Sequence, residues 1–563
     1  MKPILFAGSV IALAAVWGTP VAAKPVRHAP DLILYNGAIF TADAAHPHAQ
    51  AIAIRGERIA AVGATADIRR LAGKTTQLID LHGRTVIPGF NDAHAHLGTY
   101  AADTVFVDLG GNFDPAWPDL KAAIVKAAAG APKGALISAT IGTTILYDPA
   151  IDRASLDAAV PDHAVNLTTF DGHASILNSA ALTALGLTDA TPDPAGGRYE
   201  RDAAGHLTGT LREYAATVDA PRLQGARVSD ADALKALKDQ IDAAASFGIT
   251  TIQDMPTDAS AARTVALLAR MPTPLRVRVT RMNRTTAQGR DTDEGLEVPA
   301  HPAPLVTATG TKWVLDGVIF EGSLTPRAQG NALSAKAGGP YSFSGLPALF
   351  PPSEVEAMLR EALHDDRQLQ VHVFGTPAAK EMLDAMDATG GPKVWASRRV
   401  RFEHGDGLTP DLIKRARALG VVVSQQGDHM AIVAIEPNLG EAFQARLKAD
   451  GAQPLKSLLA AGVPLALGSD GPLNPYMGLM FATTHPDRPE EALTREQAVT
   501  AYTLGSAYAE FAEKDKGSLA PGKLADIAVL SQDIFTVAPP DLMNTKAMLT
   551  LVGGKVVYRD GTF

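Results

Sequence analysis

Two histidines stand one residue apart in the segment TVIPGFNDAHAHLG, at positions 94 and 96. Residues i and i+2 of a strand face the same side, so both imidazoles can reach one point in space. Neutral imidazole is the side chain that most often binds metal ions. The same spacing recurs in AAHPHAQ at His46 and His48, in what reads as an exposed hairpin loop. Spacing alone therefore does not identify a metal site.

Four more polar residues accompany the first pair but not the second. His372 ends LQVH, His404 ends RFEH, Asp470 ends LALGSD, and Lys312 lies in TKWVLDG. In a parallel barrel, functional side chains gather at the carboxyl ends of the strands. Taken alone, Lys312 could also be a surface charge, because TKWVLDG begins a predicted strand. The sequence predicts one metal site formed by six residues: His94, His96, Lys312, His372, His404 and Asp470.

The chain contains no cysteine, which excludes disulfides and thiolate ligands. Any metal must therefore be held by histidine, carboxylate or a modified lysine. Nitrogen and oxygen donors without sulfur suit Zn²⁺, with Mn²⁺, Fe²⁺ or Co²⁺ as alternatives. The predicted cofactor is a divalent metal, Zn²⁺, with one or two ions per chain.

The middle of the chain must supply the elements that position these residues. Short β-branched runs alternate there with helical stretches at 232–247, 352–366, 376–386 and 409–420. Such alternation predicts parallel strands joined by crossover helices. About eight strands favour a closed (β/α)₈ barrel of the α/β class. The predicted strands are 135–142, 248–255, 275–282, 311–318, 369–375, 398–405, 420–426 and 463–471.

Strand-rich segments at both ends of the chain are predicted to meet in one small β-sandwich. The predicted boundaries are 24–86 and 506–563 for the sandwich and 87–505 for the barrel. The stretch from about 100 to 240 is too long for one barrel unit and is read as an inserted cap.

The first 23 residues differ from the rest. Lys2, an apolar run of fourteen residues and the small residues Val21–Ala23 are typical of a signal peptide. We expect a secreted, periplasmic protein with no membrane partner. A formal charge of −9 without basic clusters argues against nucleic acid, so the expected partner is a small-molecule substrate. A homo-oligomer is an open possibility.

The chain resembles the amidohydrolase superfamily over nearly all of its mature length. The resemblance extends to the amidohydrolase-3 branch, which contains N-substituted formamide deformylases. It rests on VIPGFNDAHAHL, FDGHASILNSAAL, GITTIQDM, KWVLDG, VHVFG, FEHG, LGSDGP and GSLAPGKLADIAVL, in this order. It implies a metal-dependent barrel with a small β-sandwich formed by both chain ends.

The resemblance also implies roles for the six residues. His94 and His96 would bind the more buried metal, and His372 and His404 the more exposed one. Lys312 matches a carboxylated lysine that bridges both ions. Asp470 would bind metal and shuttle a proton while metal-activated hydroxide attacks an amide-like carbonyl carbon.

Further residues are predicted to lie around this centre. Asp171 and His173 in FDGHAS, and Gln425 and His429 in SQQGDH, are candidate substrate contacts. Glu403 is expected to point away from His404 and to pack or to support a ligand. The histidines expected at the surface are His163, His206, His301 and His485.

Other activities fit the same pattern. A lactonase, an esterase or a deaminase could use the same activated hydroxide. A periplasmic metal- or solute-binding protein without turnover would need no proton shuttle at Asp470. The sequence does not reveal the substrate.

Overall fold

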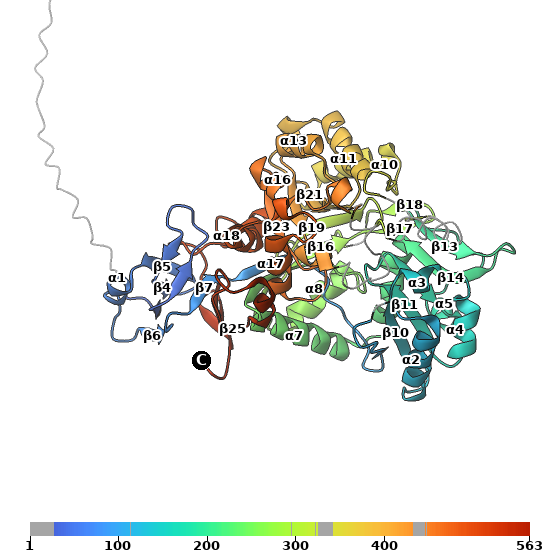
Figure 1. Ribbon diagram of the computed structural model, residues 1–563, viewed down its shortest axis with the longest axis horizontal. Coiled ribbons are helices and arrows are strands. Elements are labelled where there is room, and N and C mark those ends of the chain that lie inside the picture. Colours follow the sequence, from blue (N-terminus) through green and yellow to red (C-terminus); the bar gives the residue numbers. More distant parts are fainter. Residues whose placement is uncertain are drawn as a thin grey trace, which may run out of the picture.

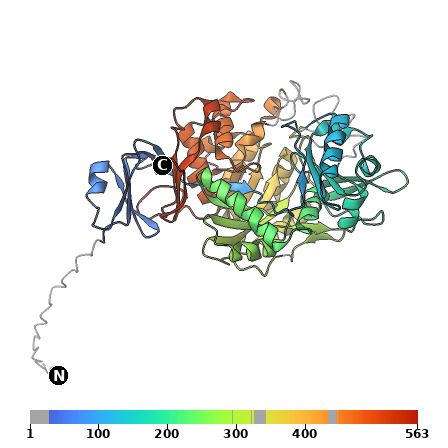
Figure 2. The same ribbon diagram turned by 90° about the horizontal axis from the view of Figure 1, so that it is seen from below.

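The computed structural model describes residues 28–112, 114–293, 295–320, 323–324, 342–431, 445 and 447–563. The predicted signal peptide lies outside these ranges. Figures 1 and 2 show a β-sandwich and a cap at opposite sides of a central barrel. Within the described ranges, no helix is long and apolar enough to cross a membrane.

Eight parallel strands form the barrel and pair in chain order. They are β8 (Phe90–Ala95), β15 (Ile249–Asp254), β16 (Arg276–Met282), β19 (Val306–Val314), β20 (Gln368–Val373), β21 (Arg401–His404), β22 (Val422–Gln425) and β23 (Leu465–Leu467). The turn after β23 meets β8, because the Asp470 amide donates to the His94 carbonyl at 2.7 Å. The predicted (β/α)₈ fold is confirmed.

This meeting of the last and first strands needs a residue without a side chain. A Cβ added at Gly468 would lie 2.4 Å from the backbone nitrogen of His94. Real Cβ atoms do not approach so closely, so the glycine of LGSDGP is required by packing.

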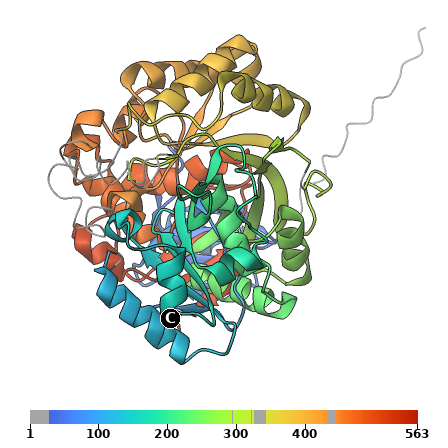
Figure 3. The same cartoon turned by 90° about the vertical axis from the view of Figure 1, so that its right-hand side faces the viewer.

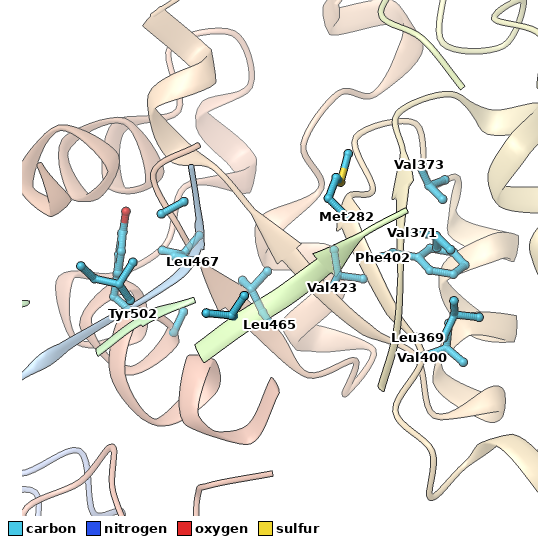
Figure 4. Packing of buried hydrophobic residues seen from close by; sticks show 14 of the residues in the cluster. Met282, Leu369, Val371, Val373, Val400, Phe402, Val423, Leu465, Leu467 and Tyr502 are labelled. Atoms are coloured by element: carbon cyan, nitrogen blue, oxygen red, sulfur yellow. The ribbon is translucent and has the colours of Figure 1, made fainter. Parts of the chain in front are cut away.

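Strand β20 shows how the barrel strands divide their side chains. Gln370 reaches Thr280 on β16 with a hydrogen bond of 3.1 Å, inside the barrel. Leu369, Val371 and Val373 alternate with the polar residues and join the main apolar core (Figure 4). Burying each such side chain contributes about 1.5–3 kcal/mol. The alternation therefore holds the strand and turns its polar residues inward.

Helices connect the barrel strands, as the sequence predicts. The longer ones are α7 (Asp230–Ser246), α8 (Ala261–Arg270), α10 (Pro352–His364), α11 (Thr376–Ala388), α13 (Pro410–Leu419) and α17 (Pro475–Thr484). Helix α13 shows the local reasons. The Thr409 hydroxyl caps its first turn, Pro410 has no amide to satisfy, and Gly420 ends it at φ +71°.

One predicted barrel strand belongs to the cap instead. Residues 135–142 contain β10 (Leu136–Ile141), which pairs with β9 (Val105–Phe106) and β11 (Ala164–Thr169). The first barrel strand is β8. Strands β8 and β10 are both short and buried, and amino-acid composition does not show which sheet a buried strand joins. The cap sheet is completed by β12 (Ala174–Leu177), β13 (Gly197–Arg201) and β14 (Leu207–Glu213). Figure 3 shows the cap in front of the barrel.

The sandwich consists of two sheets. One contains β1 (Leu32–Tyr35), β4 (Ala51–Arg55), β5 (Arg58–Gly63) and β6 (Gln77–Asp80). The other contains β2 (Ala38–Phe40), β3 (His48–Ala49), β7 (Thr85–Pro88), β24 (Ile527–Leu530), β25 (Ala547–Val552) and β26 (Lys555–Arg559). In the second sheet β7 pairs with β2 on one side and with β24 on the other. The two chain ends therefore share one sheet, as predicted.

Candidate active site

The six predicted ligands all come from the carboxyl ends of barrel strands. They lie on β8 and just after it, on β19, β20 and β21, and in the turn after β23. Donor atoms of His94, His404 and Asp470 lie within 4.8 Å of one another, close enough to share one metal ion.

Asp470 stands at the centre of this group. Its Oδ1 lies 3.1 Å from His96 Nε2 and 3.3 Å from His94 Nε2. Its Oδ2 lies 3.8 Å from His404 Nε2 and 3.5 Å from His429 Nε2. The backbone of Asp470 has φ +49°, a left-handed conformation that directs the carboxylate toward the histidines.

Three histidines present the same ring nitrogen to the site. The Nδ1–H of His94 donates to Glu403 Oε2 at 2.8 Å, and that of His96 donates to the Met255 carbonyl at 2.6 Å. The Nδ1–H of His404 donates to Gln426 Oε1 at 2.7 Å. Metal-binding histidines are held by partners of this kind on the nitrogen away from the ion. The Nε2 lone pairs are therefore free to bind a cation.

The electrostatics agree with that assignment. Burial lowers the pKa of His94 to about 4 and holds the pKa values of His372 and His404 well below the usual range. Neutral imidazoles are the form that binds metal. Among the described residues, the buried Nε2 of His372 has no hydrogen-bond partner. The donor set fits a divalent metal held by nitrogen and oxygen ligands.

Lys312 is buried beside the same group. Its Nζ lies 3.0 Å from His94 Nε2, and burial lowers its pKa to about 8. The sequence left open a surface location for this lysine. The structure places it inside the barrel mouth, two positions before the end of β19.

The cap reaches the site through His173. Its Nδ1–H donates to Glu213 Oε2 at 2.7 Å, and its ring centroid lies 4.9 Å from that of His372. Asp171 supports the turn before it, because its Oδ1 accepts from the His173 amide at 3.1 Å. His173 thus lies beside His372, and Asp171 orders the loop that carries it.

The other two predicted substrate contacts, His429 and Gln425, lie in different surroundings. His429 stacks on His404 with ring centroids 5.5 Å apart. Although burial favours its neutral form, hydrogen bonding to Asp470 raises the pKa of His429 to about 9. Gln425 is fully buried at the end of β22, and neither of its amide atoms has a partner among the described residues.

Residues near the ligands that the sequence did not reveal include Gln426, the acceptor for His404, together with Asp316 and Glu213. Asp316 is buried beside His372, with Oδ1 3.5 Å from Nε2, and accepts from the Gly375 amide at 2.6 Å. Continuing the alternation from Lys312 through Val314 would have found it. Glu213, at the end of cap strand β14, carries no comparable signal.

Two of the predicted surface histidines are buried instead. His485 is 1% exposed, and its Nε2 donates to the Gln453 carbonyl at 2.9 Å. His163 is 9% exposed and bonds the Pro132 carbonyl at 3.1 Å. Each buried ring is satisfied by a backbone carbonyl, which a sequence does not reveal. His46 and His48 are exposed in the sandwich, away from the site, as predicted.

Comparisons with known proteins extend this picture. A model of the amidohydrolase family matches residues 77–558. Protein LONG AFTER FAR-RED 3 of Arabidopsis thaliana is 28% identical over 561 residues, covering 95% of this chain and 92% of that protein. The N-substituted formamide deformylase of Arthrobacter pascens is 26% identical over 563 residues, covering 94% and 98%. An uncharacterized metal-dependent hydrolase from Pyrococcus horikoshii OT3 has the same fold, with a TM-score of 0.65 at 19% identity, covering 90% of this chain and 99% of that chain.

Proposed function

The chain belongs to the amidohydrolase family and is a metal-dependent hydrolase, and from this premise we propose that it cleaves amide-like carbon–nitrogen bonds. The proposed substrates are N-acyl, N-formyl or cyclic amides of small molecules. The similarity to an N-substituted formamide deformylase supports this choice.

The observation that carries the proposal is the arrangement of His94, His404 and Asp470. Two neutral imidazoles and a carboxylate lie within 4.8 Å of one another at the barrel mouth. When bound there, a divalent cation supplies Lewis acidity, which lowers the pKa of water and polarises a carbonyl oxygen. A storage site would not need the carboxylate to face four histidines at the open end of the barrel.

The chain itself supplies the proton transfer. Against the effect of burial, contacts with His94, His429 and His96 hold the pKa of Asp470 well below its usual range. The carboxylate can therefore accept a proton from the attacking water and return it to the departing nitrogen. His429, with its raised pKa, keeps a positive charge beside that carboxylate.

We further propose that the cation is Zn²⁺ and that Lys312 is carboxylated. A neutral lysine amine adds to carbon dioxide, loses a proton and becomes an anionic ligand with two oxygens. Burial of Lys312 and its 3.0 Å approach to His94 Nε2 support this modification. Lys312→Ala should lose bound metal, and propionate should restore part of the activity. Full metal content and activity in Lys312→Ala would refute the modification.

The function is tested with metal-loaded enzyme on a panel of N-formyl amines, N-acyl amines, cyclic ureas, lactones and aryl esters. We expect turnover of at least one amide class, with release of the amine, and its loss after chelation. Stoichiometric metal without hydrolysis of any compound would favour a binding protein. Turnover of lactones or esters alone would replace the amide assignment.

A further inference from the structure

A pocket opens beside the candidate active site. His429 lines this pocket, and its Nε2 lies 3.5 Å from Asp470 Oδ2. Phe374, directly after β20, forms another wall, and its ring centroid lies 5.8 Å from that of His404. The pocket therefore begins where the reacting atoms of a substrate would lie.

Aromatic rings form one side of this pocket. The ring centroid of Phe374 lies 5.1 Å from that of Phe343 and 6.4 Å from that of Phe320. Met430 and Leu447 extend the apolar lining. The three phenylalanines are buried in an apolar cluster separate from the main barrel core. Such walls favour a flat or branched apolar group.

An unpartnered carboxylate faces this apolar lining. Asp406 is 3% exposed and lines the pocket, and its Oδ1 has no hydrogen-bond partner among the described residues. Among the described residues, its Oδ2 has one long contact, 3.5 Å from Gln453 Nε2. A buried acceptor without a donor is costly, and native proteins keep few of them. The half-buried Asp487 adds a second acid to the lining.

His485, which also lines the pocket, does not donate to Asp406. His485 Nε2 donates to the Gln453 carbonyl, and His485 Nδ1 accepts from the Arg488 amide at 3.1 Å. Both of its ring nitrogens are therefore occupied. His429, on the same lining, interacts with Asp406 electrostatically but gives its Oδ1 no hydrogen bond. Among the described residues, Oδ1 is therefore open to a donor from a molecule in the pocket.

We propose that this pocket binds the substituent of the substrate, and that the substituent is an apolar group, such as an aromatic ring, ending in a hydrogen-bond donor. The donor, a hydroxyl or an ammonium group, bonds to Asp406 Oδ1 while the apolar group packs against the phenylalanines. This inference rests on the proposed amide hydrolysis and names its substrate class.

The experiment uses three formamides that differ only at one position. They are the N-formyl derivatives of 2-phenylethylamine, of its para-hydroxy form and of its para-aminomethyl form. We expect at least one of the two donor-bearing compounds to exceed the plain phenyl compound in kcat/KM by roughly 10- to 100-fold, the size of one hydrogen bond to a charged group. Equal kcat/KM values for all three would overturn the proposal.

Two variants locate the effect. Asp406→Asn should reduce the preference for the donor-bearing compound at least tenfold, with the plain compound as an internal control for folding and metal content. Phe343→Ala should raise KM for all three, whereas Phe350→Ala, a buried ring outside the pocket, should not. An unchanged preference in Asp406→Asn would overturn the assignment of the donor.

Binding of the product amines separates this inference from the proposed function. Calorimetry with 2-phenylethylamine, its para-hydroxy form and its para-aminomethyl form needs no catalysis. If no formamide is hydrolysed but a donor-bearing amine binds more tightly and requires Asp406, the pocket assignment holds and the proposed reaction falls. If formamides are hydrolysed and the amines bind alike to both forms of the enzyme, the reaction holds and the pocket assignment falls.

Discussion

Three histidines of the site, His94, His96 and His404, donate through Nδ1 to an oxygen on another element. In each of them, Nε2 points toward Asp470. The acceptors differ: a carboxylate, a backbone carbonyl and a side-chain amide. Each fixes one tautomer and one ring orientation. At the scale of single residues, the site is therefore set as much by the acceptors as by the histidines.

The two H-x-H pairs give a matched comparison. His94→Ala with His96→Ala should remove bound metal and lower kcat/KM by more than roughly 100-fold, because ligand nitrogens are lost. His46→Ala with His48→Ala should leave metal content and rate within error, since both side chains are exposed in the sandwich. Metal content and kcat/KM of both double variants check this. Equal losses in the two would show that the site is elsewhere.

Asp470→Asn tests the proton transfer. Asparagine keeps the shape and one oxygen but cannot accept a proton, so most of the metal should remain on the histidines. The kcat should fall by roughly 10²–10⁴-fold, as for other general acid–base groups. Steady-state kinetics with a zinc titration provide the measurement. Near wild-type kcat at saturating Zn²⁺ would reduce Asp470 to a ligand.

At the scale of elements, strand β21 departs from simple alternation. Arg401 and Glu403 face the barrel interior, so the next residue should face outward. His404 instead has φ +71°, and this left-handed residue turns its ring back toward the site. Two consecutive residues at the end of β21 therefore face the site. Glu403 contacts His94, and His404 faces Asp470.

Gly468 offers a test of how the elements meet. Gly468→Ala should push the turn after β23 away from β8, displacing Asp470 and destabilising the fold by at least roughly 1–3 kcal/mol, as overpacking does. The melting temperature and kcat should both fall. Gly471→Ala is the control, because a Cβ there would have only ordinary contacts beyond 3.4 Å. A Gly468→Ala enzyme as stable and active as Gly471→Ala would contradict this reading of the closure.

The barrel, its helices and the shared sheet were predictable because they follow from patterns repeated along the chain. Three candidate ligands, His372, His404 and Asp470, were found for the same reason, because each lies near the carboxyl end of a predicted strand. His94 and His96 were found by their spacing. What could not be predicted depends on single backbone angles and on partners distant in sequence. The cap strand β10 has the same sequence pattern as a barrel strand. The backbone carbonyl that accepts a hydrogen bond from His485 cannot be identified from the sequence.

At the scale of the whole molecule, we propose that the protein is exported. The support is the sequence of residues 1–23, with the positive Lys2, an apolar run and small residues at 21–23. Expression in a Gram-negative host should give a periplasmic protein whose first residue is near Lys24, as read by N-terminal sequencing. A soluble protein that still starts at Met1, or one retained in the membrane fraction, would contradict the proposal.

The sheet shared by both chain ends affects the order in which the molecule can be completed. Strand β7 obtains its second neighbour only when β24 has been synthesised, more than 400 residues later in the numbering. Until then one edge of β7 has unpaired backbone groups, and exposed strand edges can join other chains. Contacts this distant in sequence also form slowly. During synthesis, the nascent N-terminal half of the sandwich must therefore be kept from aggregating until nearly the entire polypeptide has been made.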